Sequence, residues 1–158
     1  MIILGIDPGT TRIGYGAVEK TGGTLTHHAS GLIECASGNL AEQLHIIEKR
    51  VEDVIKKTKP AKAGVEKLFF SKNKKTALTT AHARGVILSA LRKHNIEIVE
   101  LSPVEVKLGV TGYGSASKQA VAAMVSRILN ISTKNVIDDT TDALAIAITA
   151  AYTSINGR

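Results

Sequence analysis

The sequence predicts an α/β fold in which helices flank a five-stranded mixed sheet, with three antiparallel strands followed by parallel strands. Three observations lead to this prediction. The N-terminal 33 residues contain three short strand-like segments joined by turns that contain glycine. From residue 39 onward, apolar residues recur at helical spacing over long stretches. Short apolar segments at 63–66 and 96–99 interrupt those stretches, and strands that alternate with helices are typical of parallel pairing.

The three N-terminal strands are expected at 1–6, 13–19 and 24–33. The first is a short, continuous apolar run, which is the pattern of a buried strand. Pro8 and Gly9 indicate a turn after it, because these residues favour the backbone angles that turns need. Gly22-Gly23 then indicates a hairpin turn between the second and third strands, so the three strands should form an antiparallel meander.

The remaining elements alternate between helices and strands. A helix that begins near Asn39 should end before Pro60, and Pro103 suits the first turn of a later helix. The later helices are expected at 75–94, 103–108, 118–129 and from Asp138 or Asp139 to 153, with a glycine-bearing loop at 109–117. Three antiparallel strands followed by this alternation are the ribonuclease H-like order, and we expect one such domain over residues 1–158.

Length and composition limit the class of protein. A chain of 158 residues fits one domain, since domains commonly have about 100–200 residues. The 20 lysines and arginines against 14 acidic residues give a net charge of +6, which permits nucleic-acid binding without establishing it. Cys35 is the only cysteine, which excludes an intrachain disulfide. The apolar runs are too short for a signal peptide or a membrane span, so we expect a soluble, cytoplasmic protein with no membrane partner.

Four carboxylates stand at the ends of predicted elements. Asp7 and Glu66 each end a buried strand, and they would leave the same edge of the sheet if those strands are parallel neighbours. Asp139 and Asp142 are three residues apart and share one face of a helix. Each acid alone could be an ordinary turn residue, strand-end charge or helix cap. Together, without a convincing histidine or cysteine cluster, they predict a site for a hard cation, Mg²⁺ or alternatively Mn²⁺.

Such a carboxylate site suits phosphodiester hydrolysis. Two ions per subunit, about 3.5–4 Å apart, would activate water and stabilise the leaving 3′-oxygen in an in-line displacement that yields 5′-phosphate and 3′-hydroxyl ends. In this interpretation Asp7 bridges the ions, Glu66 binds one, and Asp139 with Asp142 completes the other. Asp138 also shares a helical face with Asp142, so spacing alone leaves the choice between Asp138 and Asp139 open.

Several short motifs follow one another in a specific order along the chain. They are Asp7-Pro8-Gly9-Thr10, Val65-Glu66, Phe69-Phe70-Ser71-Lys72-Asn73, Ala83-Arg84-Gly85, Ser102-Pro103-x-Glu105-Val106-Lys107, Gly112-Tyr113-Gly114-x-x-x-Lys118 and Asp139-x-x-Asp142-Ala143-Leu144-Ala145. With these motifs, the chain from Met1 to about Tyr152 resembles the RuvC-type Holliday junction resolvases. The resemblance implies a homodimer that makes Mg²⁺-dependent, symmetric nicks in four-way DNA junctions, for recombination and repair, beside a branch-migration motor. It also implies a catalytic tetrad of Asp7, Glu66, Asp139 and Asp142, and so favours Asp139 over Asp138.

Candidate DNA contacts lie close to these motifs. Adjacent rings rarely both face a core, so either Phe69 or Phe70 could stack on an unpaired base, beside phosphate-binding lysines such as Lys72. The ordinary alternative is that both rings are buried and the lysines are solvated. The resemblance favours Phe69 as the stacking ring and assigns Lys107 and Lys118 to the DNA backbone near the cut. The small residues of the 75–94 helix could pack on the sheet or, as the resemblance implies, on a twin helix across a two-fold axis.

Two other functions fit part of the sequence. Gly5-Ile6-Asp7-x-Gly9-Thr10 resembles the first phosphate loop of actin-like and sugar-kinase-like ATPases, but those proteins need two lobes and a second Asp-Gly-rich loop. A junction-binding protein without nuclease activity would use the basic surface and the phenylalanines, and its four acids would be dispensable. Cleavage of a four-way junction distinguishes this alternative from a nuclease.

Overall fold

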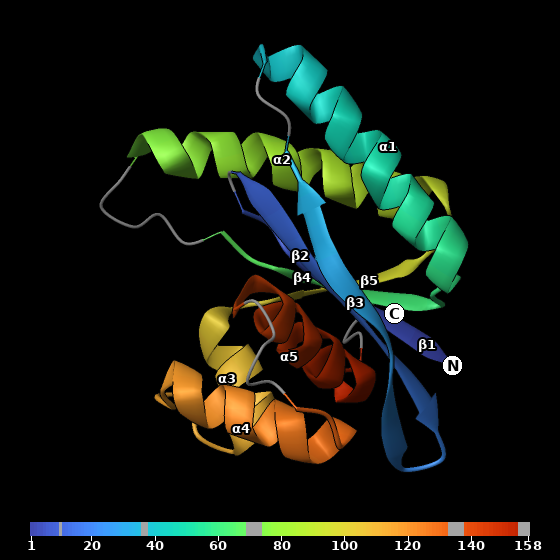
Figure 1. The fold of residues 1–158 in the computed structure, drawn as a ribbon, viewed down its shortest axis with the longest axis vertical. Helices are drawn as coiled ribbons and strands as arrows, with labels where there is room; N and C mark the ends of the chain where they lie inside the picture. Colours follow the sequence, from blue (N-terminus) through green and yellow to red (C-terminus); the bar gives the residue numbers. More distant parts are fainter. Residues whose placement is uncertain (10, 36–37, 69–73, 133–137, 155–158) are drawn as a thin grey trace.

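The computed structural model describes residues 1–9, 11–35, 38–68, 74–132 and 138–154. It has three layers: a five-stranded sheet, two long helices on one face and three helices on the other (Figure 1). Each face of the sheet contributes to its own hydrophobic core, one under the two long helices and one under the other three. This arrangement confirms the predicted mixed sheet flanked by helices.

The sheet has the strand order β3-β2-β1-β4-β5. Its strands are β1 (Ile2–Asp7), β2 (Arg12–Thr21), β3 (Thr24–Glu34), β4 (Lys62–Glu66) and β5 (Glu97–Leu101). The first three are antiparallel to one another, whereas β4 is parallel to both β1 and β5. Ile6 of β1 pairs with Val65 of β4, so the next residues, Asp7 and Glu66, leave the sheet at the same edge.

The two long helices cover one face of the sheet and the three others cover the opposite face (Figure 1). The long helices are α1 (Leu40–Thr58) and α2 (Lys74–Lys93), and the others are α3 (Pro103–Thr111), α4 (Lys118–Leu129) and α5 (Asp138–Tyr152). Polar side chains fix three of the helix starts, because each accepts a hydrogen bond from a free backbone N–H. These caps are Asn39 for α1, Ser102 for α3 and Ser117 for α4.

Helix α5 lies directly against the middle of the sheet. Its residues from Ala143 to Ala151 are all buried, since the sheet covers one side and α3 and α4 cover another. Gly5 permits this close packing, because a Cβ atom at residue 5 would lie 2.0 Å from the Ala143 carbonyl oxygen. The contact brings the first turn of α5, with its acidic residues, to the sheet edge where β1 ends.

One predicted boundary is wrong. The loop expected from Gly109 begins only after Thr111, because Gly109 lies inside α3. A Cβ atom at residue 109 would lie 2.6 Å from Thr149 Cγ2, so this glycine serves the packing of α3 on α5 and does not end the helix. Gly112, with a φ angle of 76°, caps the helix instead. Within the described part of the chain, no helix combines the length and apolar character needed to cross a membrane.

Candidate active site

Asp7 and Glu66 lie side by side where β1 and β4 end, and their carboxyl groups share a hydrogen bond. Burial raises the pKa of Asp7 to about 6, and the negative charges of Asp142 and Asp139 add to this rise. Burial raises the pKa of Glu66 to about 7, with further contributions from Asp7 and Asp142. Without a cation, the pair therefore holds a proton into the neutral range.

Asp139 and Asp142 stand on the first turns of α5, each paired with a basic side chain. Lys118 Nζ donates to Asp142 Oδ2 at 3.0 Å, and the Arg12 guanidinium donates to Asp139 through Nε. Both carboxylates are close enough to Asp7 to raise its pKa. The structure thus gathers the four acids at one edge of the sheet.

Asp138 and Asp139 differ in what they face. A Cβ atom at Gly14, which pairs with Asp7 across β1 and β2, would lie 2.0 Å from the Asp139 carbonyl oxygen. The charge of Asp139 raises the pKa of Asp7, whereas the charge of Asp138 contributes instead to the raised pKa of Lys118. Asp138 is also exposed. Asp139 therefore lies near enough to Asp7 for its charge to act there, whereas Asp138 is exposed and its charge acts on Lys118.

The donor set fits a hard divalent cation. All four groups are carboxylates. The raised pKa values of Asp7 and Glu66 reflect burial first and neighbouring negative charge second, and a bound cation would offset both. Among the described residues, no three carboxylate, imidazole or thiol groups already converge in an ion-holding arrangement. Asp139 and Asp142 instead each bind a basic side chain.

A cavity of about 130 Å³ opens beside these acids, between β4 and the helices α3, α4 and α5. Its polar lining residues are Glu66, Asp142, Lys107 and Lys118. Two of the predicted DNA-binding lysines therefore lie at the carboxylate cluster. Phe69 and Lys72, the other two predicted DNA contacts, fall outside the described residues.

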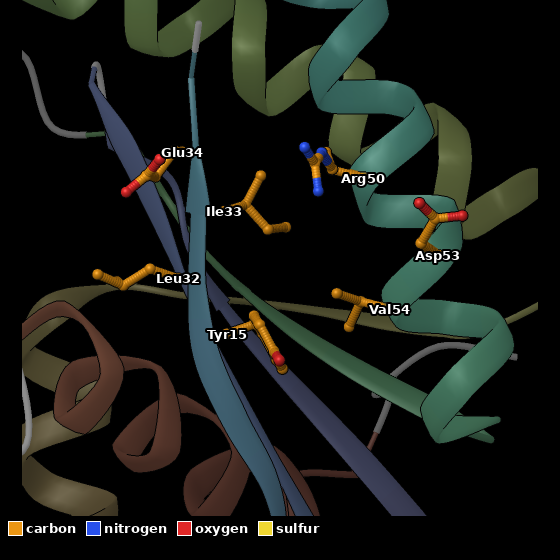
Figure 2. Close-up of a pocket in the computed structure, with 7 residues that line it drawn as sticks. All are labelled: Tyr15, Leu32, Ile33, Glu34, Arg50, Asp53 and Val54. Carbon is orange, nitrogen blue, oxygen red and sulfur yellow. The ribbon is translucent and has the colours of Figure 1, made fainter.

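A separate hollow of about 320 Å³ lies between β3 and α1 (Figure 2). Arg50 and Val54 of α1 point toward Ile33 of β3 across it, and Tyr15 of β2 lies at its lower end. None of the six predicted site residues that the structure describes lines this hollow. This hollow is larger than the cavity beside the four acids, but the groups suited to binding a cation lie at the carboxylate cluster.

Sequence reasoning missed two arginines that contact the cluster. Arg84 of α2 donates from Nε to the Glu66 carbonyl oxygen at 2.9 Å and pairs through Nη2 with Glu100. Only 15% of its side chain is exposed. The Ala83-Arg84-Gly85 motif indicated Arg84 but did not suggest what this residue does. Nothing in the sequence singled out Arg12.

Replacing Arg84 by glutamine should destabilise the protein by about 2 kcal/mol, because the Glu66 carbonyl and Glu100 both lose a charged donor. The junction cleavage that the sequence resemblance implies should also fall about tenfold, since Arg84 holds the end of β4 from which Glu66 projects. Urea unfolding and junction cleavage measure the two effects. Arg92→Gln, an exposed change on the last turn of α2, is the matched control, and equal effects of both variants would contradict this role.

The raised pKa values predict how the stability of the metal-free chain depends on pH. Between roughly pH 4 and 7 the folded pair binds more protons than the unfolded chain, because its folded pKa values lie above the ordinary ones. Its contribution to stability is therefore fully present below about pH 4 and is lost as the pH rises through 6 to 7. Urea unfolding in a chelator at pH 5 and pH 8 should show a smaller decrease for Asp7→Asn than for the wild type. An unchanged decrease would contradict the shared proton.

Several known proteins are similar to this chain over most of its length. The family model described as crossover junction endodeoxyribonuclease RuvC matches residues 3–150. A protein of that name from Brachyspira hyodysenteriae is 46% identical over 153 residues, covering 96% of this chain and 94% of its own length. Another from Carboxydothermus hydrogenoformans is 44% identical over 147 residues, covering 93% of each.

Solved structures are similar over the same range. Thermus thermophilus RuvC in complex with a Holliday junction substrate superposes with a TM-score of 0.89 at 30% identity, covering 96% of this chain and 93% of that one. The yeast mitochondrial Holliday junction resolvase Ydc2 has a TM-score of 0.70 at 14% identity, covering 93% and 77%, which is a likeness of fold alone. These likenesses confirm the ribonuclease H-like fold expected from the order of elements.

Proposed function

Because the chain belongs to the RuvC family of crossover junction endodeoxyribonucleases and is an enzyme of that class, we propose that it binds four-way DNA junctions and resolves them by paired, symmetric nicks. One observation supports this most: four carboxylates gather at one sheet edge beside the cavity that Lys107 and Lys118 line. Acids and lysines in one place suit a reaction on an anionic backbone.

We propose that Asp7, Glu66, Asp139 and Asp142 hold Mg²⁺, or Mn²⁺ as an alternative, with two ions per subunit. The raised pKa values of Asp7 and Glu66 support this, since buried carboxylates that resist ionisation alone are suited to a cation. When bound, the ions supply activation of water and charge neutralisation at the phosphate. The carboxylates must lose their shared proton first, which the pKa of Glu66, about 7, permits at neutral pH and above.

The basic side chains have a separate task in the proposed reaction. Lys107 and Lys118 line the cavity next to Glu66 and Asp142, so they can bind the phosphates on either side of the scissile bond. Water attacks the phosphorus in line with the 3′-oxygen, the P–O3′ bond breaks, and the products carry 5′-phosphate and 3′-hydroxyl ends. Phe69 and Lys72 are proposed to contact the unpaired base and its backbone, on the resemblance alone.

We also propose a homodimer, because paired nicks in a four-way junction need two sites related by symmetry. Helix α2 contributes small residues and the exposed Leu78, which suit a contact with a twin helix. The resemblance further suggests a branch-migration motor as a partner. Sedimentation should give twice the chain mass at micromolar concentration, and a monomer there would contradict the dimer.

The test of the proposed ligand set compares Asp139→Asn with Asp138→Asn on a synthetic four-way junction in Mg²⁺. We expect Asp139→Asn to lower cleavage at least about a hundredfold, because it removes a proposed ion ligand. Asp138→Asn should stay within about threefold of the wild type, because Asp138 is exposed and faces Lys118. Loss of cleavage only in Asp138→Asn would make Asp138 the ligand, and a linear duplex of the same sequence is the substrate control.

A further inference from the structure

Arg12 binds a carboxylate that the proposed function assigns to the metal. From this contact we infer that Arg12 is a positioning residue, which holds Asp139 in the metal-free chain and is displaced from it when a divalent ion binds. The inference rests on the proposed metal site and adds a side chain that competes with the ion for one of its ligands. It concerns a residue that neither the motifs nor the spacing of acids indicated.

Strand β2 holds Asp139 at two points. Arg12, the first residue of β2, donates from Nε to the Asp139 carboxylate. Two residues further on, Gly14 lies under the Asp139 backbone, where any side chain would collide with the carbonyl oxygen. Because Gly14 also pairs with Asp7, the same strand sets the position of Asp139 relative to Asp7. Arg12 therefore orients the carboxylate within the cluster.

The four acids are neutralised in two different ways. Asp7 and Glu66 share a hydrogen bond, with raised pKa values. Asp139 and Asp142 pair instead with Arg12 and Lys118. The guanidinium and the ammonium group are thus resident counter-ions for the two carboxylates of α5.

An ion that takes Asp139 Oδ2 has to displace the guanidinium, because Arg12 Nε occupies that oxygen. Arginine stays charged at any physiological pH, so it can leave only by rotating away and cannot leave by losing a proton. Half of the Arg12 side chain is exposed, compared with 27% for Asp139, so the freed guanidinium can be solvated by water. Displacement is therefore feasible, and it lowers the apparent affinity for the ion by the strength of the ion pair.

Because of this competition, loss of the Arg12 guanidinium should have opposite effects on the stability of the metal-free protein and on its affinity for the ion. Removing the guanidinium should weaken the metal-free chain, because Asp139 loses its partner. The same change should tighten ion binding, because nothing has to be displaced. Removing an arginine that only supports the fold would lower both stability and ion affinity.

The experiment measures the rise in thermal midpoint on titration with Mg²⁺ for Arg12→Gln and the wild type. We expect the dissociation constant for Mg²⁺ to fall about fivefold in Arg12→Gln, the size expected for a partly exposed ion pair. Arg127→Gln removes the same charge from the exposed last turn of α4 and should change the constant less than twofold. Arg12→Lys keeps the charge on a different group, and its dissociation constant for Mg²⁺ should lie between those of Arg12→Gln and Arg127→Gln.

A double-mutant cycle with Asp139→Asn identifies the partner. The metal-free thermal midpoints should be non-additive, and this coupling should disappear or change sign in saturating Mg²⁺. The inference would be overturned if Arg12→Gln bound Mg²⁺ more weakly than the wild type, or if its effect equalled that of Arg127→Gln. Coupling that persists in Mg²⁺ would also overturn it. If Asp7→Asn leaves Mg²⁺ binding unchanged, the proposed metal site itself is wrong. If Asp7→Asn abolishes binding and Arg12→Gln does nothing, only the role of Arg12 is wrong.

Discussion

Asp7→Asn should lower the rate of junction cleavage at least about a thousandfold and leave junction binding within about threefold. Asparagine has nearly the same shape as aspartate but no charge, so the proposed bridging ligand between the ions is lost. A thousandfold decrease corresponds to about 4 kcal/mol of transition-state stabilisation, within the several kcal/mol that a bound ion supplies. Binding should persist because the lysines beside the cavity remain.

Cleavage is measured on a synthetic four-way junction in Mg²⁺, and binding on the same junction in a chelator. Asp53→Asn makes the same chemical change at an exposed residue of α1, and we expect wild-type cleavage from it. Near-wild-type cleavage by Asp7→Asn would refute the proposed role of the carboxylates. A wild-type chain that binds the junction without cutting it would favour the alternative of a junction-binding protein.

Gly5→Ala should destabilise the protein by about 3 kcal/mol, a large effect for one methyl group. The added Cβ would lie 2.0 Å from the Ala143 carbonyl oxygen and 2.5 Å from the Ala147 backbone nitrogen. Both neighbours are helix backbone atoms, so α5 as a whole has to move away from β1, and overpacking of this kind is costly. Cleavage should fall as well, because α5 holds Asp139 and Asp142.

Urea unfolding measures the loss of stability, and Gly23→Ala is its control. Gly23 lies in the β2–β3 turn, where an added methyl group would meet no atom of the described residues within 4 Å apart from its neighbours in the chain. We expect its substitution to change stability by less than about 0.5 kcal/mol. If both variants unfold at the same urea concentration, the close contact between α5 and β1 is wrong. A Gly5→Ala protein that is destabilised yet cleaves normally would separate the packing from the site.

The order of strands and helices could be predicted because its signals are local. The apolar run before Asp7, the Gly22-Gly23 hairpin and the proline in the first turn of α3 each act within a few residues. The end of α3 could not be predicted in this way. Gly109 is a residue typical of loops, but it lies inside α3, where its missing side chain leaves space for Thr149, forty residues later.

The acids of the candidate site were also visible in the sequence, because carboxylates at the ends of buried elements are unusual enough to suggest a cation. Which of these acids lie close to one another in space was not visible in the sequence. Helical spacing does not distinguish Asp138 from Asp139, and only the orientation of α5 against Gly14 places Asp139 where its charge raises the pKa of Asp7. That orientation depends on the rotation of one helix against a sheet, which no local pattern encodes.

By itself, therefore, the sequence determined which elements form and which acids end them, because hydrophobic period, turn chemistry and caps are properties of neighbouring residues. The tertiary structure alone decided which charges meet. Arg12 is 127 residues from Asp139, and Arg84 reaches the Glu66 carbonyl from another layer. Such contacts arise only when distant elements pack on one sheet, because the distance between two charges is set by the fold and not by their separation along the chain.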